Sequence, residues 1–241
     1  MIRVCAISDL HSHLPNVEPC DILLLPGDIC DNDNSVAQVG WLYDTFKPWL
    51  EKVPAKHVVG IAGNHDLVFG KHSELVPRNM RWHYLQGTIV KVEGLTIYGL
   101  PWSLPIWGAF QLDEEGLKRK CSQIPSYTDI IISHGPPYGI GDGVPRSITP
   151  EREHLWPEIE HVGSFALYEA IFDVKPLLCA FGHIHEGRGH WRYGPPDEYS
   201  LLEHPIVLAN VSHRNSQFEP VHNPMVFDID LEKRNIELIS E

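Results

Sequence analysis

Side chains that can bind metal ions follow five short apolar runs of the sequence, each at the point where the run ends. They are carboxylates, imidazoles and one amide: Asp9 and His11, Asp28, Asn64, His134, and His183 with His185. Oxygen and nitrogen donors without a thiolate are typical of sites for Mn²⁺, Fe²⁺, Zn²⁺ or similar ions, rather than of a structural zinc site. The pattern therefore indicates a metal centre that does chemistry.

The spacing inside these motifs adds geometric expectations. Asp9 and His11 are two residues apart, so an extended backbone would project both side chains toward one ion. Asp28 has two carboxylate oxygens and could bridge two ions, and Gly63 lets the chain turn sharply before Asn64. Each motif alone is equally typical of a helix cap, a turn or a hydrogen-bonded histidine. Five of them in succession favour the metal interpretation.

The elements that must position these residues follow from the hydrophobic pattern. Continuous apolar runs of three to six residues indicate strands buried on both faces, here at 2–7, 22–25, 57–61, 130–132, 177–181 and 206–209. Further strands are expected at 82–85, 89–92 and 95–99, with a closing hairpin at 225–229 and 235–239. The longer segments between them predict helices at 35–50, 112–122 and 163–174. Strands that alternate with helices indicate an α/β layered fold, in which ligands bind beyond the carboxyl ends of the strands.

Two stretches are expected to lack regular structure. Residues 136–157 are rich in Gly and Pro, which predicts a long loop over the site. Residues 187–204 form a second irregular stretch. No repeat, low-complexity tract or linker divides the sequence, so we expect a single domain over residues 1–241.

The charge balance excludes some classes of partner. The 241 residues include 19 Lys+Arg and 32 Asp+Glu, a formal net charge of −13, which argues against a nonspecific binder of nucleic-acid polymers or anionic membranes. An anionic substrate is still compatible, because bound metal ions can reverse the local field. The five cysteines form no CxxC motif, and no apolar run is long enough for a signal peptide or a membrane span. These features predict reduced thiols and a cytoplasmic location.

Taken together, the motifs resemble the five signature blocks of the calcineurin-like metallophosphoesterase superfamily. The blocks are Asp9-x-His11, Gly27-Asp28, Gly63-Asn64-His65-Asp66, His134-Gly135 and Gly182-His183-x-His185. The resemblance implies a four-layer α/β/β/α metallophosphoesterase sandwich with a two-metal site. A narrower similarity, carried by residues 97–102, 134–137, 181–187 and 210–212, is to the metallophosphoesterase-domain-containing subgroup, whose members are cyclic-nucleotide and general phosphodiesterases. Some members have Gly where this sequence has His183.

The resemblance also implies a role for each motif residue. The first ion would be held by Asp9, His11, Asp28 and His185, and the second by Asp28, Asn64, His134 and His183. His65 would act on the substrate. Asp66 either orients His65 or is a turn residue facing solvent. Purple acid phosphatases hold Fe³⁺ through a Tyr three residues after the bridging Asp, but that position here is Asp31. We therefore expect two divalent ions, with Mn²⁺ or Fe²⁺ favoured and Zn²⁺ possible.

These inferences predict a binuclear metal-dependent phosphodiesterase that hydrolyses small phosphodiesters such as cyclic nucleotides. One alternative is a phosphomonoesterase or protein phosphatase of the same superfamily, and another is a non-catalytic scaffold with this fold. Neither a nucleic-acid polymer nor a membrane is expected as a partner, and the oligomeric state is open. Softer candidates are His13 and Asn32 near the metal ligands, Arg188 for a phosphate oxygen, and Trp102, Trp107 and Phe110 for stacking on a base. The remaining histidines, His154, His161, His190, His204 and His222, are expected on the surface.

Overall fold

The protein contains two six-stranded sheets. The computed structural model describes residues 1–31, 34–145, 159–195 and 202–241. In the first sheet the central strands are parallel, β13 and β14 are antiparallel additions at one edge, and β4 closes the other. Its order is β14 (Asn235–Ser240), β13 (Met225–Asp230), β1 (Ile2–Ala6), β2 (Cys20–Pro26), β3 (Ala55–Ile61) and β4 (His83–Tyr84).

The second sheet has a parallel centre with one antiparallel strand at each edge. Its order is β11 (Gly189–Tyr193), β12 (Ile206–Asn210), β10 (Leu178–Phe181), β7 (Ile130–Ser133), β6 (Leu95–Leu100) and β5 (Thr88–Val92). The parallel strands are the apolar runs of the sequence, and their residues are almost entirely buried. A parallel strand covered on both faces must be apolar throughout, which explains these runs.

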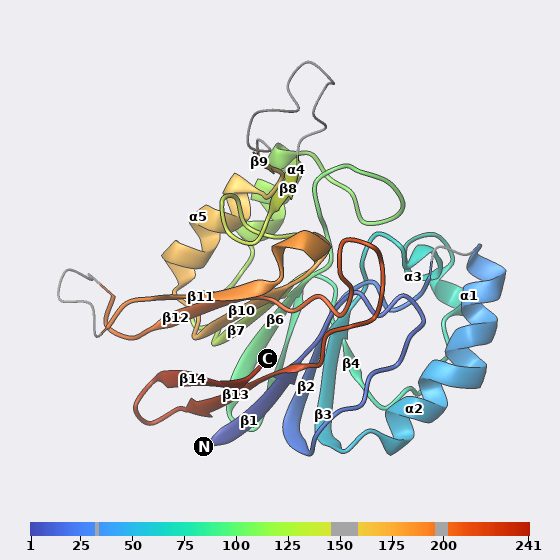
Figure 1. Cartoon of the computed structure of the whole chain (residues 1–241), viewed down its shortest axis with the longest axis horizontal. Helices are drawn as coiled ribbons and strands as arrows, with labels where there is room; N and C mark the ends of the chain where they lie inside the picture. The colour runs from blue at the N-terminus through green and yellow to red at the C-terminus, as the bar shows by residue number, and fades with distance from the viewer. Residues whose placement is uncertain (32–33, 146–158, 196–201) are drawn as a thin grey trace.

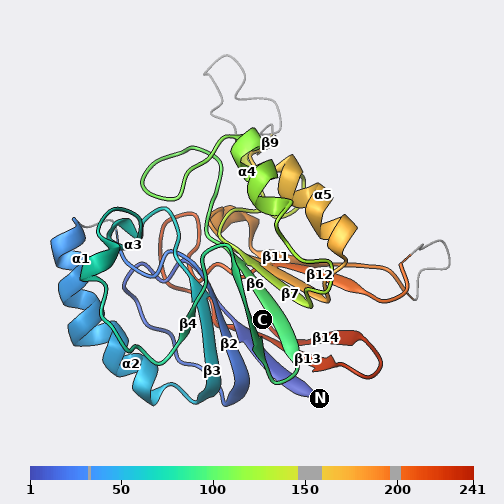
Figure 2. The same ribbon diagram turned by 180° about the vertical axis from the view of Figure 1, so that it is seen from behind.

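Helices cover the outer face of each sheet (Figures 1 and 2). A continuous helical run lies on the first sheet: α1 (Ser35–Trp41), a π-helical turn η1 (Leu42–Phe46) and α2 (Lys47–Lys52), with the short α3 (Leu67–Lys71) beside it. The second sheet is covered by α4 (Glu114–Cys121) and α5 (Phe165–Val174). Each of α1, α4 and α5 begins after a polar residue whose side chain accepts hydrogen bonds from free N–H groups of the first turn. These capping residues are Asn34, Asp113 and Ser164.

Three apolar layers hold the sandwich together. Between the sheets, Val4, Leu24 and Ile61 of the first sheet pack with Ile97 and Ile132 of the second. The other two layers lie between each sheet and its helices. The order helix, sheet, sheet, helix confirms the predicted four-layer α/β/β/α sandwich.

Most predicted elements are present, and the differences lie outside the central strands. The helices predicted at 35–50, 112–122 and 163–174 correspond to the α1–α2 run, α4 and α5, whereas the short α3 was not predicted. The stretch 187–204 is not wholly irregular, because β11 pairs with β12 over its first residues. Trp191 and Tyr193 of β11 are less exposed than His190 and Arg192, which is the alternation of an edge strand with one covered face.

The stretch 136–157 lies partly within the described residues. It begins as a loop and continues into β8 (Gly143–Pro145), which pairs with β9 (Ile159–His161), and residues 146–158 lie outside the described part. Two short 3₁₀ turns, η2 (Ser73–Leu75) and η4 (His185–Gly187), complete the elements of the described residues. None of the helices among the described residues is long and apolar enough to cross a membrane.

Candidate metal centre

The ligands predicted from the sequence meet where the carboxyl ends of the parallel strands of both sheets come together. Asp9 follows β1, Asp28 follows β2 and Asn64 follows β3, all from the first sheet. His134 follows β7 and His183 follows β10, from the second sheet. The two sheets therefore contribute facing halves of one site, as expected for strands whose carboxyl ends share an edge.

The backbone at several of these residues is left-handed rather than extended. The φ angle is 56° at Asp9, 42° at His11, 50° at Asp28 and 71° at His183. The expectation that Asp9 and His11 lie on an extended backbone is therefore wrong. Non-glycine residues adopt this conformation only at a cost of about 1–3 kcal/mol, so surrounding contacts must hold it.

Two motif glycines are required by close packing against these side chains. A Cβ added to Gly63 would collide with Asp28 Oδ1 and lie 2.6 Å from His134 Cε1. A Cβ added to Gly182 would collide with Asp9 Oδ2 and with the hydroxyl of Ser8, which itself donates to Asp9 Oδ2 at 2.6 Å. Any side chain at either position would displace a candidate ligand.

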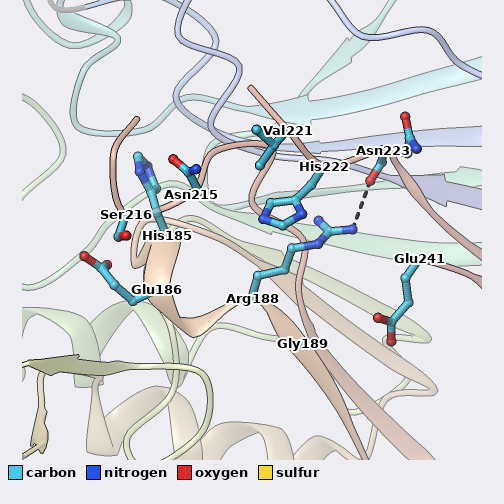
Figure 3. A pocket seen from close by; sticks show the side chains of 10 residues that line it. All are labelled: His185, Glu186, Arg188, Gly189, Asn215, Ser216, Val221, His222, Asn223 and Glu241. Atoms are coloured by element: carbon cyan, nitrogen blue, oxygen red, sulfur yellow. Dashed lines mark hydrogen bonds between the residues drawn. The ribbon is translucent and has the colours of Figure 1, made fainter. Parts of the chain in front are cut away.

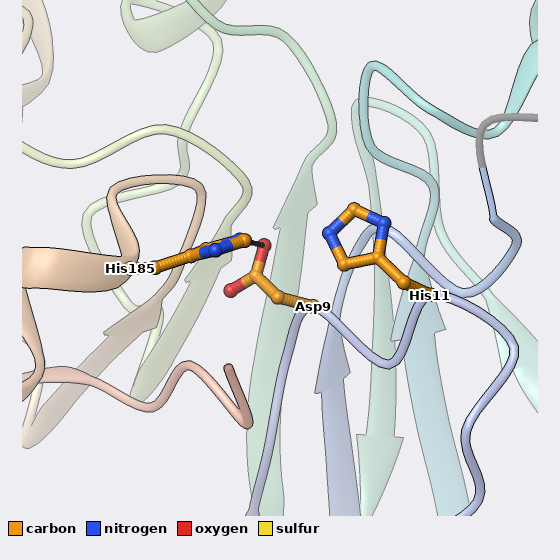
Figure 4. A group of neighbouring side chains, drawn as sticks. All are labelled: Asp9, His11 and His185. Atoms are coloured by element: carbon orange, nitrogen blue, oxygen red, sulfur yellow. Dashed lines mark ion pairs between the residues drawn. The ribbon is translucent and has the colours of Figure 1, made fainter. Parts of the chain in front are cut away.

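The first group of candidate ligands is Asp9, His11 and His185, shown in Figure 4. One ligand atom from each lies within 4.8 Å of the others, and Asp9 Oδ1 is 3.7 Å from His185 Nε2. All three side chains are buried. His11 Nε2 is also buried and has no hydrogen-bond partner among the described residues, which is unusual for a buried polar atom and is explained if a ligand occupies its lone pair.

The second group is Asp28, His134 and His183, again with ligand atoms within 4.8 Å of one another. Asp28 Oδ2 lies 3.4 Å from His134 Nε2 and 3.8 Å from His11 Nε2, so this carboxylate stands between the two groups. Asn64 donates its amide to Trp107 O at 3.0 Å, and its Oδ1 is therefore directed to His134 Nε2, 2.8 Å away. All seven predicted ligands thus converge.

The protonation preferences of the site suit cations. Burial lowers the pKa of His11 to about 4, and burial together with His134 lowers the pKa of His183 to about 3. Both rings are therefore neutral, with a free lone pair, the form that binds metal. Burial disfavours a charge on Asp28, but the neighbouring His134 outweighs burial, and the pKa of Asp28 lies well below its usual range. Burial disfavours a charge on His134, but Asp28 outweighs burial and raises the pKa of His134 to about 9, so a metal ion bound there would displace a proton. Two buried carboxylates beside the neutral rings of His11 and His183 are a donor set that fits divalent ions.

His65 lies at the edge of this cluster. Its backbone N–H donates to Asp28 Oδ1 at 2.8 Å, and its carbonyl accepts from the Gln38 side chain at 2.7 Å. Its ring is 4.6 Å from that of His11, and its buried Nδ1 has no hydrogen-bond partner in the part of the chain that the structure describes. The ring is therefore fixed beside the candidate ions while one nitrogen is left for another molecule.

Asp66 connects the loops that carry the ligands. Its side chain is fully buried, so the solvent-facing interpretation is wrong. Its carboxylate accepts the backbone N–H groups of Ile29 at 3.1 Å, Cys30 at 2.7 Å and Gly63 at 2.7 Å, whereas His65 Nδ1 has no partner. Burial and the nearby Asp28 raise the pKa of Asp66 to about 7. These contacts show Asp66 fixing the loops after β2 and β3, and no hydrogen bond of the described residues has it orienting His65.

The softer candidates have mixed outcomes. The Arg188 guanidinium donates to the carbonyls of Ser212 at 2.7 Å and Asn223 at 3.0 Å, so it clamps a loop instead of projecting toward a phosphate. It borders an open cavity of about 660 Å³ beside His185, shown in Figure 3. The Trp107 ring is 5.5 Å from that of His65, Phe110 packs against the core beneath α3, and Asn32 lies outside the described residues.

The remaining histidines differ in exposure. His13 Nδ1 is 2.9 Å from Nε2 of the buried His213. His161 and His190 are exposed as expected, and each is paired with a carboxylate. His204 and His222 are half-buried, and His154 lies outside the described residues.

Sequence reasoning missed two residues of the site, both in the loop between β12 and β13. The Phe218 ring lies 4.6 Å from that of His185 and 5.8 Å from that of His11. Arg214 donates to the carbonyls of Leu10 at 3.0 Å and His11 at 2.9 Å, and to Phe218 O. Neither belongs to a motif, and only the folded chain brings them to the first ligand loop.

Comparisons with known proteins agree with this geometry. A family model described as calcineurin-like phosphoesterase matches residues 2–187. Human metallophosphoesterase domain-containing protein 1 is 29% identical over 257 residues, which cover 94% of this chain and 71% of the human protein. A UPF0046 protein of Caenorhabditis elegans is 27% identical, covering 95% and 82%. The crystal structure of phosphopantetheinyl hydrolase from Mycobacterium tuberculosis shares the fold, with a TM-score of 0.52 and 16% identity over 87% of this chain and 88% of that one.

The predicted resemblance is thereby confirmed, both to the superfamily and to the metallophosphoesterase-domain-containing subgroup. The matched region contains every one of the seven candidate ligands. The chain belongs to the calcineurin-like phosphoesterase family.

Proposed function

We propose that the protein is a metal-dependent phosphodiesterase that hydrolyses small phosphodiesters, cyclic nucleotides among them, at a centre of two divalent ions. The observation that carries this proposal is the pair of buried ligand groups with Asp28 between them. Asp9, His11 and His185 would hold one ion, Asn64, His134 and His183 the other, and Asp28 both. Two ions in such sites supply Lewis acidity for the phosphoryl oxygens and an acidified water.

His65 is the residue placed to act on the substrate. Its ring is positioned by the backbone bond to Asp28 and by contact with His11. Its unpartnered Nδ1 would donate to a phosphoryl oxygen or protonate the leaving alkoxide, a contribution of about 10²–10⁴-fold for general acid catalysis.

The arginines around the site already bind other groups of the protein, which supports a diester substrate over a monoester substrate. A monoester dianion favours extra Arg or Lys donors. Arg188 and Arg214 already donate to backbone carbonyls, and Arg3 pairs with Asp228 at the opposite end of β1. A singly charged diester needs fewer such groups.

The direct test compares two chromogenic substrates. The protein is loaded with Mn²⁺ or Fe²⁺, and kcat/KM is measured for bis(p-nitrophenyl) phosphate and p-nitrophenyl phosphate at the same pH. We expect the diester to be preferred. A clear preference for the monoester would establish the phosphomonoesterase alternative, and failure to hydrolyse either substrate with both ions bound would favour the non-catalytic scaffold.

A further inference from the structure

A second cavity, of about 380 Å³, lies beside His183 and next to the candidate centre. Its walls are mainly apolar, with Leu100, Trp102, Leu104, Ile106 and Leu117 among them. The size and lining are those of a site for a small organic group.

The cavity is physically tied to the centre. One wall belongs to the loop 101–111, in which Trp107 O accepts the Asn64 side chain at 3.0 Å and Ala109 N–H donates to Asn64 O at 2.8 Å. Another part of the lining is His183 itself. A phosphate held between the two ligand groups would therefore have the cavity open to one of its ester groups.

The charges of the cavity disfavour a second phosphate there. None of the described residues that line it is Lys or Arg, and Glu160 adds an acidic group. An anion would be repelled, so the occupant is the neutral part of the substrate.

The first polar group of the lining is the imidazole of His161, which is held in place by a buried carboxylate. His161 Nδ1 is 2.7 Å from Asp142 Oδ1, and Asp142 is fully buried. The other oxygen of Asp142 accepts the N–H groups of Gly139 and Gly163, both at 2.9 Å, so the carboxylate is a fixed acceptor. Nδ1 must then be the donor, and Nε2 is left for a partner outside this pair. The arrangement sets both the orientation and the tautomer of the ring.

The second polar group is Ser103, which is 2% exposed. Its hydroxyl has no hydrogen-bond partner among the described residues, although Ser103 borders the cavity. A buried hydroxyl without a partner costs about 1–3 kcal/mol. A polar group of a ligand in the cavity that reached this hydroxyl would supply the missing hydrogen bond.

We propose that this cavity binds the heteroaromatic base of a nucleotide diester, with His161 and Ser103 as specificity residues that hydrogen-bond the polar edge of the base. The apolar walls contact the faces of the ring. A plain aryl or alkyl group would fill the walls but leave both polar groups unsatisfied, and a site built to hydrogen-bond its ligand rejects analogues that lack the matching atoms. The inference rests on the proposed function.

The test measures selectivity in the full-length, Mn²⁺-loaded protein. For His161→Gln and Ser103→Ala, we expect the ratio of kcat/KM for 2′,3′-cyclic AMP to that for bis(p-nitrophenyl) phosphate to fall about 3- to 10-fold each, the loss of one hydrogen bond. Matched controls exist for both. His190 Nδ1 pairs with Glu241 at 2.7 Å, as His161 does with Asp142, and Thr128 has another buried hydroxyl without a partner. Neither control residue lines the cavity, so His190→Gln and Thr128→Val should leave the ratio unchanged.

Binding of adenosine to the metal-free protein separates this inference from the proposed function. Calorimetry should show that each cavity variant lowers the affinity for adenosine by the same factor by which it lowers the selectivity ratio. If the wild type hydrolyses neither diester but binds adenosine in this way, the proposed function fails and the cavity assignment stands. If adenosine does not bind, or binds the cavity variants as well as the wild type, the cavity assignment is overturned even in an active enzyme.

Discussion

The two ends of the parallel strands in the first sheet handle charge in opposite ways. At the amino ends, Lys56 pairs with Asp21 at 2.6 Å and Arg3 with Asp228 at 2.9 Å, in contacts that water reaches. Such surface pairs contribute about 0–1 kcal/mol. At the carboxyl ends, Asp9 and Asp28 are almost completely buried among imidazoles. Because burying a charge costs several kcal/mol, the buried carboxylates at the carboxyl ends are not explained by stability and are consistent with a site organised for a ligand, whereas the charges at the amino ends are left in water.

Two arginines, each of which donates to three backbone carbonyls, also differ between the two ends of the strands. Arg81 donates to the carbonyls of Leu50, Val53 and Ala55, where the chain passes from α2 into β3. Arg214 also donates to three carbonyls, but two of them belong to Leu10 and His11 in the first ligand loop. Left-handed backbone at Asp9 and His11 needs such support, so the same clamp has a structural role at one end and a positioning role at the other.

The largest effect is expected from removing the carboxylate between the two ligand groups. Asp28→Ala should lower the affinity for both ions by more than about 100-fold, because substitutions of groups that only support metal ligands already lower metal affinity about 10–100-fold. Elemental analysis after Mn²⁺ loading and dialysis measures this. Asp21→Ala, at the other end of β2, is the control and should retain two ions. Loss of only one ion from Asp28→Ala would show that this carboxylate does not bridge.

Removing the substrate-facing imidazole should separate metal binding from turnover. His65→Ala is expected to retain both ions while kcat for bis(p-nitrophenyl) phosphate falls about 10²–10⁴-fold. His72→Ala is the control, since His72 is an exposed histidine at the end of α3. Loss of metal from His65→Ala would make His65 a ligand. This is a real alternative, because ligand atoms of His11, Asp28 and His65 also lie within 4.8 Å of one another.

The two arginine clamps can be compared directly. Arg214→Met and Arg81→Met should each lower the free energy of unfolding of the metal-free protein by roughly 1–3 kcal/mol, because each removes the guanidinium donors from a set of buried carbonyls. Arg214→Met should in addition weaken Mn²⁺ binding by about 10–100-fold, measured by calorimetry below the unfolding transition. Equal metal affinities in the two variants would reduce Arg214 to a structural role.

The strands of this protein could be predicted from its sequence better than its loops. The buried strands and the ligand residues at their ends could be predicted, because a strand covered on both faces must be apolar and its end is where polar residues begin. The backbone of Asp9 and His11 could not, since left-handed φ angles at non-glycine residues depend on distant contacts such as that from Arg214. The hydrogen bonds of Asp66 to Ile29 and Cys30 were inaccessible for the same reason, because these partners lie 37 and 36 residues away in sequence.

The smallest effect is expected far from the ligands, in the helical layer. Gly40 is exposed in α1, and a Cβ added there would meet nothing within 4 Å. Gly40→Ala should therefore raise the free energy of unfolding by about 0.5–1 kcal/mol, because alanine loses less backbone entropy in a helix. Metal affinity and kcat/KM should stay at wild-type values, because the contact of α1 with the ligand loop is made by Gln38, which donates to His65 O, and not by Gly40. Denaturant unfolding of the metal-free protein measures the gain, and a change in metal content would show that the backbone at Gly40 also affects the ligand loop.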